Sequence, residues 1–217
     1  MQLNKYIDHT ILKAQATQSD IQKLCAEAKQ YNFASVCVNA CWIAYAKELL
    51  QGSDVNIACV VGFPLGATTT ATKVFESVEA VKNGADEIDM VLNVGKMKDG
   101  DYDFVLNDIK QVVDQSRAVV KVILETCLLT KEEIAKATQI AVQAGARFVK
   151  TSTGFSSGGA TVEDVEIMKA NCGNAHIKAS GGIRDYDTAV AMIKAGATRL
   201  GTSSSINIVE HKETTSQ

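Results

Sequence analysis

Charged residues occur inside segments whose composition is otherwise that of buried strands. Asp89 interrupts EIDMV, Lys121 interrupts VVKVILE, Lys150 ends RFVK and Lys178 ends HIK, and strand alternation adds Glu125 to the face of Lys121. Strands of a parallel sheet are buried on both faces and are normally continuous apolar runs. A buried ion-pair network that only stabilises the packing would account for any one of these residues. Several of them, on separate strands at a similar depth, favour a functional site.

Two lysines at neighbouring strand ends indicate covalent chemistry with a carbonyl compound. Each cation disfavours the charge on the other, so the pKa of one amine falls and a free amine is present at neutral pH. Such an amine forms a Schiff base, whose protonated form withdraws electrons so that a nearby C–C bond can break or form. Asp89 and the second lysine can carry the protons that this reaction requires. The residue types leave open whether Lys150 or Lys178 is the nucleophile.

Two loops rich in glycine and serine follow the last two apolar segments. The first is ASGGIRD, after Lys178, and the second is GTSSS. In parallel barrels, the loops after strands seven and eight commonly bind phosphate through backbone N–H groups. A third loop, TSTGFSSGG, follows Lys150. The residues expected to face a phosphate are Gly154, Gly181, Gly182, Gly201, Ser203 and Ser204.

Eight short apolar, β-branched segments recur at intervals of 23 to 32 residues, which is the spacing of strand-helix units. They predict strands at Tyr6–His9, Ala34–Val38, Ile57–Val61, Glu87–Leu92, Val119–Leu124, Phe148–Lys150, His176–Lys178 and Arg199–Gly201. We expect one α/β domain over residues 1–217, folded as a single closed (β/α)₈ TIM barrel, with which an extra N-terminal helical segment is compatible. An open doubly wound sheet is the alternative. No G-x-G-x-x-G opens the first unit, which argues against a dinucleotide fold.

Helix-terminal signals lie between these segments. Three threonines precede an acid by three residues, as in the N-terminal capping box: Thr17 with Asp20, Thr130 with Glu133 and Thr161 with Asp164. Three Gly-Ala pairs, at Gly84, Gly145 and Gly196, end helical segments just before a strand, where glycine accepts the left-handed conformation.

The composition excludes several classes of partner and cofactor. The chain has 217 residues, 46% hydrophobic and 22% charged, with a net charge of −3, which predicts neither nucleic-acid nor membrane binding. The six cysteines form no C-x-x-C pair and the chain has three histidines, so we expect no metal and no cofactor. The N-terminus lacks an apolar signal core, which predicts a cytoplasmic protein. Cys37, at a strand end near the barrel mouth, is interpreted as a core residue.

Eight motifs along the chain resemble those of the deoxyribose-phosphate aldolase family of class I aldolases. They span Tyr6 to Ile208: YIDHTILK, SVCVN, VVGFPLG, DEIDMVLNVG, KVILET, FVKTSTGF, IKASGGIR and GTSSS. The resemblance implies a (β/α)₈ barrel that cleaves 2-deoxy-D-ribose 5-phosphate to acetaldehyde and D-glyceraldehyde 3-phosphate, in deoxyribonucleoside breakdown. It also implies a homodimer.

The same resemblance implies roles for the charged residues. Lys150 would form the Schiff base, Asp89 would donate and accept protons, and Lys178 would lower the pKa of Lys150 and join the proton relay. Phe155 departs from members that carry lysine after TSTG, so one phosphate or sugar contact would differ. The tail VEHKETTSQ lacks the terminal tyrosine that some members have.

Two other functions remain compatible with the residues. One is a metal-independent sugar-phosphate isomerase in which Asp89 and a lysine transfer protons. The other is a non-catalytic barrel that binds a phosphorylated metabolite.

Overall fold

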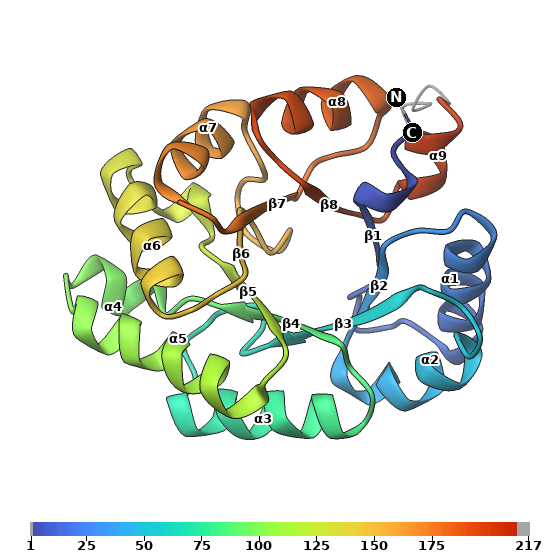
Figure 1. Cartoon of the computed structure of the whole chain (residues 1–217), viewed down its shortest axis with the longest axis horizontal. Coiled ribbons are helices and arrows are strands. Elements are labelled where there is room, and N and C mark those ends of the chain that lie inside the picture. The colour runs from blue at the N-terminus through green and yellow to red at the C-terminus, as the bar shows by residue number, and fades with distance from the viewer. Residues whose placement is uncertain (1, 212–217) are drawn as a thin grey trace.

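Eight parallel strands close into a barrel in chain order, with helices around the outside (Figure 1). The structure is a computed structural model and describes residues 2–211. The strands are β1 (Ile7–Thr10), β2 (Ser35–Val38), β3 (Asn56–Val61), β4 (Glu87–Val91), β5 (Val119–Ile123), β6 (Phe148–Lys150), β7 (His176–Ser180) and β8 (Arg199–Thr202). Each begins within one residue of its expected start, and β1 pairs with β8. The TIM barrel is therefore confirmed, and the open sheet is excluded.

The helices cover the barrel, and all of them except α9, which follows the last strand, connect successive strands. They are α1 (Gln18–Gln30), α2 (Ile43–Leu49), α3 (Thr70–Lys82), α4 (Val94–Lys98), α5 (Tyr102–Ser116), α6 (Lys131–Gln143), α7 (Val162–Asn171), α8 (Tyr186–Ala195) and α9 (Ser205–Val209). Ahead of β1, the extra N-terminal segment is a single 3₁₀ turn, Asn4–Tyr6. Within the described residues, no helix is long and apolar enough to cross a membrane.

The three expected threonine caps all form at helix N-termini, but only two of them are complete capping boxes. Thr17 and Thr130 form complete capping boxes at the starts of α1 and α6. Thr161 caps α7 by accepting from the backbone N–H of Asp164, but the carboxylate of Asp164 accepts from Lys131 at 2.6 Å instead of closing the box. That acid therefore connects α7 to the start of α6.

Glycine is required where three helices end. Gly84, Gly145 and Gly196 have φ values of 113°, 91° and 124°. Other residues rarely adopt this backbone conformation, so glycine lets the chain leave the helix and turn directly into the next strand.

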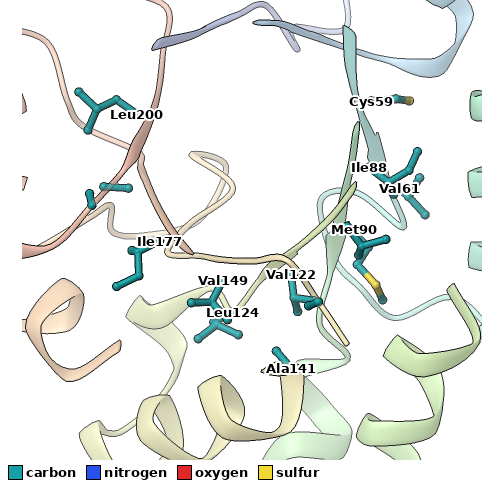
Figure 2. Packing of buried hydrophobic residues seen from close by; sticks show 14 of the residues in the cluster. Cys59, Val61, Ile88, Met90, Val122, Leu124, Ala141, Val149, Ile177 and Leu200 are labelled. Atoms are coloured by element: carbon teal, nitrogen blue, oxygen red, sulfur yellow. The ribbon is translucent and has the colours of Figure 1, made fainter. Parts of the chain in front are cut away.

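Alternate strand residues face opposite sides of the barrel wall. The outward set packs under the helices and forms the main hydrophobic core, as Val122, Val149 and Ile177 do near Ala141 of α6 (Figure 2). A small apolar cluster of Leu12, Cys37, Ala58 and Val60, with Phe63 against it, occupies the β2–β3 side of the interior. Cys37 is fully buried in that cluster, which confirms its interpretation as a core residue. Elsewhere in the interior, several charged side chains lie close together.

A buried ion pair also lies outside the barrel, between α3 and α5. Lys73 Nζ donates to Asp108 Oδ2 at 2.6 Å and to the Val91 carbonyl at 3.0 Å, and Thr70 donates to Asp108 Oδ1 at 2.7 Å. Both charged side chains are buried. The pair thus connects two helices to the end of β4.

We expect Lys73→Met to lower the free energy of unfolding by about 3–5 kcal/mol, because it leaves the Asp108 carboxylate buried without its cation. The double variant Lys73→Met/Asp108→Leu should recover most of this loss, since no unpaired charge remains. Urea unfolding measures both. Lys110→Met, which breaks the exposed Lys110–Asp114 pair, is the control and should cost less than about 1 kcal/mol. Equal effects of Lys73→Met and Lys110→Met would contradict the assignment.

Candidate active site

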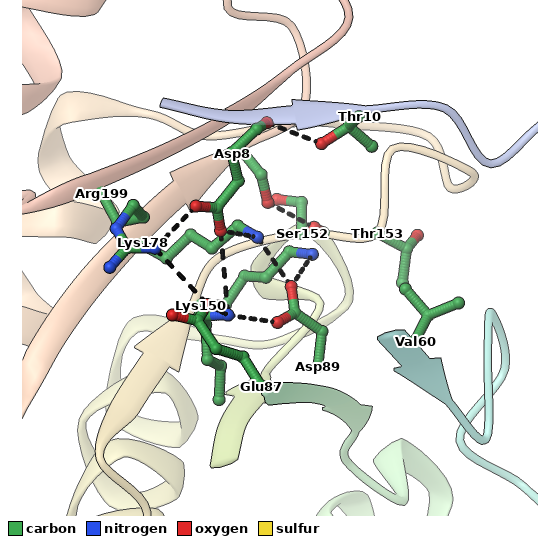
Figure 3. A network of polar contacts seen from close by, with 12 residues as sticks. Asp8, Thr10, Val60, Glu87, Asp89, Lys150, Ser152, Thr153, Lys178 and Arg199 are labelled. Carbon is green, nitrogen blue, oxygen red and sulfur yellow. Dashed lines mark hydrogen bonds and ion pairs between the residues drawn. The ribbon is translucent and has the colours of Figure 1, made fainter. Parts of the chain in front are cut away.

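The four charged residues expected from the strands meet inside the barrel. Lys150 lies opposite Lys178 in the β6–β7 register, and Asp89 lies opposite Lys121 in the β4–β5 register. Asp89 Oδ2 is 2.8 Å from Lys150 Nζ and 2.7 Å from Lys178 Nζ, while Asp89 Oδ1 is 2.8 Å from Lys121 Nζ. All four side chains are buried. One carboxylate therefore contacts three lysine side-chain nitrogens. Figure 3 shows Asp89 with two of these lysines, Lys150 and Lys178.

Three further charged residues, not identified from the sequence, complete this network. Asp8 of β1 contacts Lys178 at 2.5 Å and Arg199 of β8 at 2.7 Å. Glu87 of β4 contacts Lys121, and lies 3.4 Å from Arg199. Asp8 and Glu87 could have been identified from the sequence, since each is an acid inside a predicted strand and Glu87 is two residues from Asp89.

The charges balance only when Lys150 is neutral. The three carboxylates of Asp8, Glu87 and Asp89 match the three cations of Lys121, Lys178 and Arg199. A protonated Lys150 would add one uncompensated positive charge to a buried cluster, which is unfavourable at low dielectric. The network therefore favours a free amine at Lys150.

The pKa shifts agree with this distribution. Burial lowers the pKa of Lys150, and the Lys178 charge lowers it further, against the opposing effect of Asp89. Burial also disfavours the charge on Lys178, but Asp8 and Asp89 outweigh it and raise the pKa of Lys178 above its usual value. For Asp89, burial raises the pKa, yet the three lysines hold it well below its usual range. The site thus combines a neutral amine, a carboxylate and an ammonium group.

A cavity of about 570 Å³ opens at the carboxyl ends of the strands and reaches this amine. It is lined by Thr10, Ile11, Leu12, Lys13, Lys150, Thr153, Gly154, Phe155, Ser180, Gly181, Gly182, Ile183, Arg184, Gly201, Thr202, Ser203 and Ser204. All six residues expected to face a phosphate are in this set. Of the charged network, Lys150 is the member that lines the cavity.

Side-chain hydrogen bonds hold the loops around the cavity. The Thr151 hydroxyl donates to the Ser180 carbonyl at 2.9 Å and accepts from its N–H at 3.0 Å. Strand alternation ends at Ile123, and Glu125 has a φ of 56°. The buried Glu125 carboxylate accepts from the N–H of Thr153 at 3.2 Å and from its hydroxyl. Glu125 therefore fixes the loop that follows Lys150.

The glycines of these loops meet different requirements. A Cβ on Gly201 would lie 2.9 Å from Lys178 Cε, so this glycine leaves room for the lysine as well as bordering the cavity. A Cβ on Gly159 would lie 2.3 Å from the carbonyl oxygen of Gly181, because the two loops touch there. Gly154 and Gly182 have φ values of 82° and 80° and face open space.

Two cationic side chains and one phenylalanine lie at the rim of the cavity. Lys13 and Arg184 line it, and within residues 2–211 neither has an acidic partner. Phe155 is half exposed and packs edge-on against Phe63, with ring centroids 5.2 Å apart. Lys13 went unrecognised in the sequence because no glycine or serine pattern marks its loop.

The expectation about the tail, which lacks a terminal tyrosine, falls mostly on residues 212–217, and these lie outside the described residues.

The sequence is similar to known aldolases over nearly its whole length. Residues 3–211 match the model of a family described as DeoC/LacD family aldolase. Deoxyribose-phosphate aldolase of Mycoplasma capricolum is 59% identical over 215 residues, covering 98% of this chain and 97% of the relative. Deoxyribose-phosphate aldolase of a Geobacillus species is 61% identical over 211 residues, covering 96% and 95%.

Solved structures show the same likeness. A putative deoxyribose-phosphate aldolase from Coccidioides immitis superposes with a TM-score of 0.95 at 44% identity, covering 96% of this chain and 85% of that one. A tetrameric deoxyribose phosphate aldolase from Aeropyrum pernix gives 0.90 at 31% identity, covering 96% and 89%.

Proposed function

This chain belongs to the DeoC/LacD family of aldolases, and from that premise we propose that it cleaves 2-deoxy-D-ribose 5-phosphate. The products are acetaldehyde and D-glyceraldehyde 3-phosphate, and the reaction is reversible. The observation that carries this proposal is the position of Lys150. Its buried amine has a lowered pKa, lies 2.8 Å from the Asp89 carboxylate and borders the cavity.

Lys150 starts the reaction as the nucleophile. Its neutral Nζ attacks the C1 carbonyl of the open-chain sugar, and loss of water from the carbinolamine gives a protonated Schiff base. A base then removes the proton of the C3 hydroxyl, the C2–C3 bond breaks, and its electron pair moves into the iminium group. D-glyceraldehyde 3-phosphate leaves, and an enamine of acetaldehyde stays on Lys150. We assign the base to Asp89, whose lowered pKa keeps it ionised.

Lys178 completes the cycle as the acid. Its raised pKa keeps it protonated, and it shares Asp89 Oδ2 with Lys150. A proton delivered from Lys178, by way of Asp89 or a water molecule, converts the enamine to the iminium form of acetaldehyde. Hydrolysis then releases acetaldehyde and restores the Lys150 amine. The roles follow from one environment that drives two lysine pKa values in opposite directions.

The phosphate of the substrate is proposed to lie at the β7 and β8 loops. Gly154, Gly181, Gly182, Gly201, Ser203 and Ser204 supply N–H and hydroxyl groups around the cavity. Lys13 and Arg184 supply the positive charge, since Phe155 brings none. A doubly charged phosphate gives these rim cations an anionic partner.

We expect Lys13→Met and Arg184→Met each to raise the KM for 2-deoxyribose 5-phosphate about fivefold to tenfold, which is the effect of one charge-assisted contact near solvent. The kcat should change little, because neither residue touches the reacting carbons. Steady-state kinetics against unphosphorylated 2-deoxyribose should show no such change. Lys23→Met is the control, because Lys23 is exposed and lies outside this cavity. Equal losses on both sugars would contradict a phosphate contact.

Product analysis separates this function from the alternatives. Incubation of the purified protein with 2-deoxyribose 5-phosphate, followed by NMR, should show acetaldehyde and glyceraldehyde 3-phosphate. An isomerase would instead form another sugar phosphate of unchanged mass. Binding without turnover would indicate a phospho-metabolite-binding barrel.

We further propose that the chain is one catalytic domain that acts as a homodimer in the cytoplasm. Phe75 and Val78 lie three residues apart on α3 and are exposed to 70% and 43%, and Leu65 nearby in sequence is exposed to 76%. Exposed apolar side chains of this size favour a subunit contact. The six cysteines are unpaired, which suits a reducing compartment.

A further inference from the structure

A chain of polar groups runs along the outer side of β1, separate from the lysine network. His9 follows Asp8 in the strand, so its side chain points to the opposite face. His9 Nε2 is 2.8 Å from Glu27 Oε2 of α1, and His9 Nδ1 is 2.8 Å from Ser205 Oγ at the start of α9. In Figure 1, α9 lies between α8 and α1 on the outside of the barrel. His9 and Ser205 are both buried.

The partners of His9 determine its tautomer. Burial lowers the pKa of His9, and the neighbouring Glu27 carboxylate opposes this only in part, so the ring is neutral near pH 7. A carboxylate can only accept, so Nε2 carries the hydrogen and donates to Glu27. Nδ1 is then an acceptor, and the Ser205 hydroxyl donates to it. Lys23, the other charged group acting on His9, also favours the neutral ring.

Ser205 connects this chain to the loops of the cavity. It begins α9 only three residues after Thr202, the register partner of His9 between β1 and β8. Because its single hydrogen is donated to His9, Ser205 is joined to Thr202 through this short stretch of backbone, and the Thr202 carbonyl 3.2 Å away receives no hydrogen bond from it at the same time. The Thr202 hydroxyl donates to the Ile183 carbonyl at 2.7 Å and accepts from the Ser204 N–H at 2.9 Å. Thr202 thus joins the loop after β7 to the loop after β8.

We propose that His9 is a positioning residue for the phosphate end of the substrate. Through Ser205 it holds the start of α9 against β1 and so keeps Thr202 and the two joined loops in their binding geometry. This inference rests on the proposed phosphate site at those loops. It assigns a function to a strand residue that touches neither the lysines nor the large cavity.

A hydrolytic role for the Ser205–His9–Glu27 arrangement does not fit the geometry. A serine nucleophile must meet a substrate, but Ser205 is fully buried and does not line the cavity that holds Lys150. An adjoining cavity of about 410 Å³, which shares Lys13 and Ser203 with the larger one, is lined by His9 and Glu27 but not by Ser205. The hydroxyl therefore acts within the fold.

The test compares two substitutions that each keep one half of the histidine. His9→Asn retains an acceptor near the Nδ1 position and so keeps the Ser205 contact. His9→Gln places its amide near the Nε2 position and keeps the Glu27 contact instead. We expect His9→Gln and Ser205→Ala to raise the KM for 2-deoxyribose 5-phosphate about tenfold, with kcat within about twofold of the starting protein. His9→Asn should be close to the starting protein.

The matched substrate is unphosphorylated 2-deoxyribose, for which kcat/KM should stay within about twofold in all these variants. Equal losses on both sugars, or no change on either, would overturn the inference. Should the buried variants fail to fold, Glu27→Leu removes the group that fixes the tautomer at a partly exposed site. It should raise the KM for the phosphorylated sugar about threefold, whereas Lys23→Gln should leave it unchanged.

The kcat/KM values of the unaltered protein for the two sugars separate a failure of the proposed phosphate site from a failure of the inference about His9. If it cleaves both sugars with equal kcat/KM, the phosphate site itself is wrong and the His9 inference falls with it. If it strongly prefers the phosphorylated sugar and the variants keep that preference, only the inference about His9 is wrong.

Discussion

Replacing Asp89 with asparagine is expected to lower kcat about 10²–10⁴-fold, the usual contribution of a positioned general base. Asparagine keeps the shape of the side chain but cannot accept the C3 hydroxyl proton. The same change removes the negative charge that raises the pKa of Lys150. Lys150 therefore stays neutral in Asp89→Asn, and Schiff-base formation should survive the loss of turnover.

Two measurements on Asp89→Asn test this separation. Steady-state cleavage of 2-deoxyribose 5-phosphate should fall, while borohydride reduction in the presence of acetaldehyde should still label Lys150. Circular dichroism shows whether the variant is folded, since Asp89 contacts three buried lysines. A folded variant with unchanged kcat would remove Asp89 from the proton transfer.

The second large effect is expected from Lys178→Leu, which should lower kcat at least about 10²-fold at neutral pH. The leucine cannot protonate the enamine. Loss of the Lys178 charge also removes one of the causes that lower the pKa of Lys150, so that pKa rises. The acid limb of the pH–rate profile should therefore move to higher pH, because the active form of Lys150 is the free amine.

Lys178→Arg separates charge from proton transfer. Arginine keeps the positive charge between Asp8 and Asp89 but stays protonated at any working pH. We expect its kcat to fall as in Lys178→Leu, while its acid limb stays nearer that of the unaltered protein. An unchanged profile and rate in Lys178→Leu would show that the neighbouring lysine takes no part in catalysis.

Local sequence patterns were sufficient to predict the barrel. Short apolar segments at the spacing of strand-helix units located all eight strands, and threonine and glycine marked the helix ends. These signals are local, because a cap or a left-handed glycine depends on residues within one turn. The charges at Asp89, Lys121, Lys150 and Lys178 were visible because a buried strand rarely contains them.

Interactions that depend on barrel closure were not predicted. Asp8 and Arg199 are 191 positions apart and meet because β1 pairs with β8. The same closure places His9 beside Ser205. Lys13 reaches the cavity through the course of the loop after β1, and no periodic pattern describes such a loop. The charge balance of the network could be judged only when all of its charged residues were known. The sequence attributed the lowered pKa of Lys150 to the charge of the neighbouring lysine, whereas burial in the folded barrel is the largest cause.

Reductive trapping with acetaldehyde tests the central claim most directly. Treatment of the protein with acetaldehyde and sodium borohydride should reduce the Schiff base, place an ethyl group on Lys150 Nζ and irreversibly abolish cleavage. Peptide mass spectrometry locates the adduct, and Lys150→Met should remain unlabelled at the site. An unmodified Lys150 with retained activity, or an adduct on Lys178 instead, would contradict the assignment of Lys150 as the nucleophile.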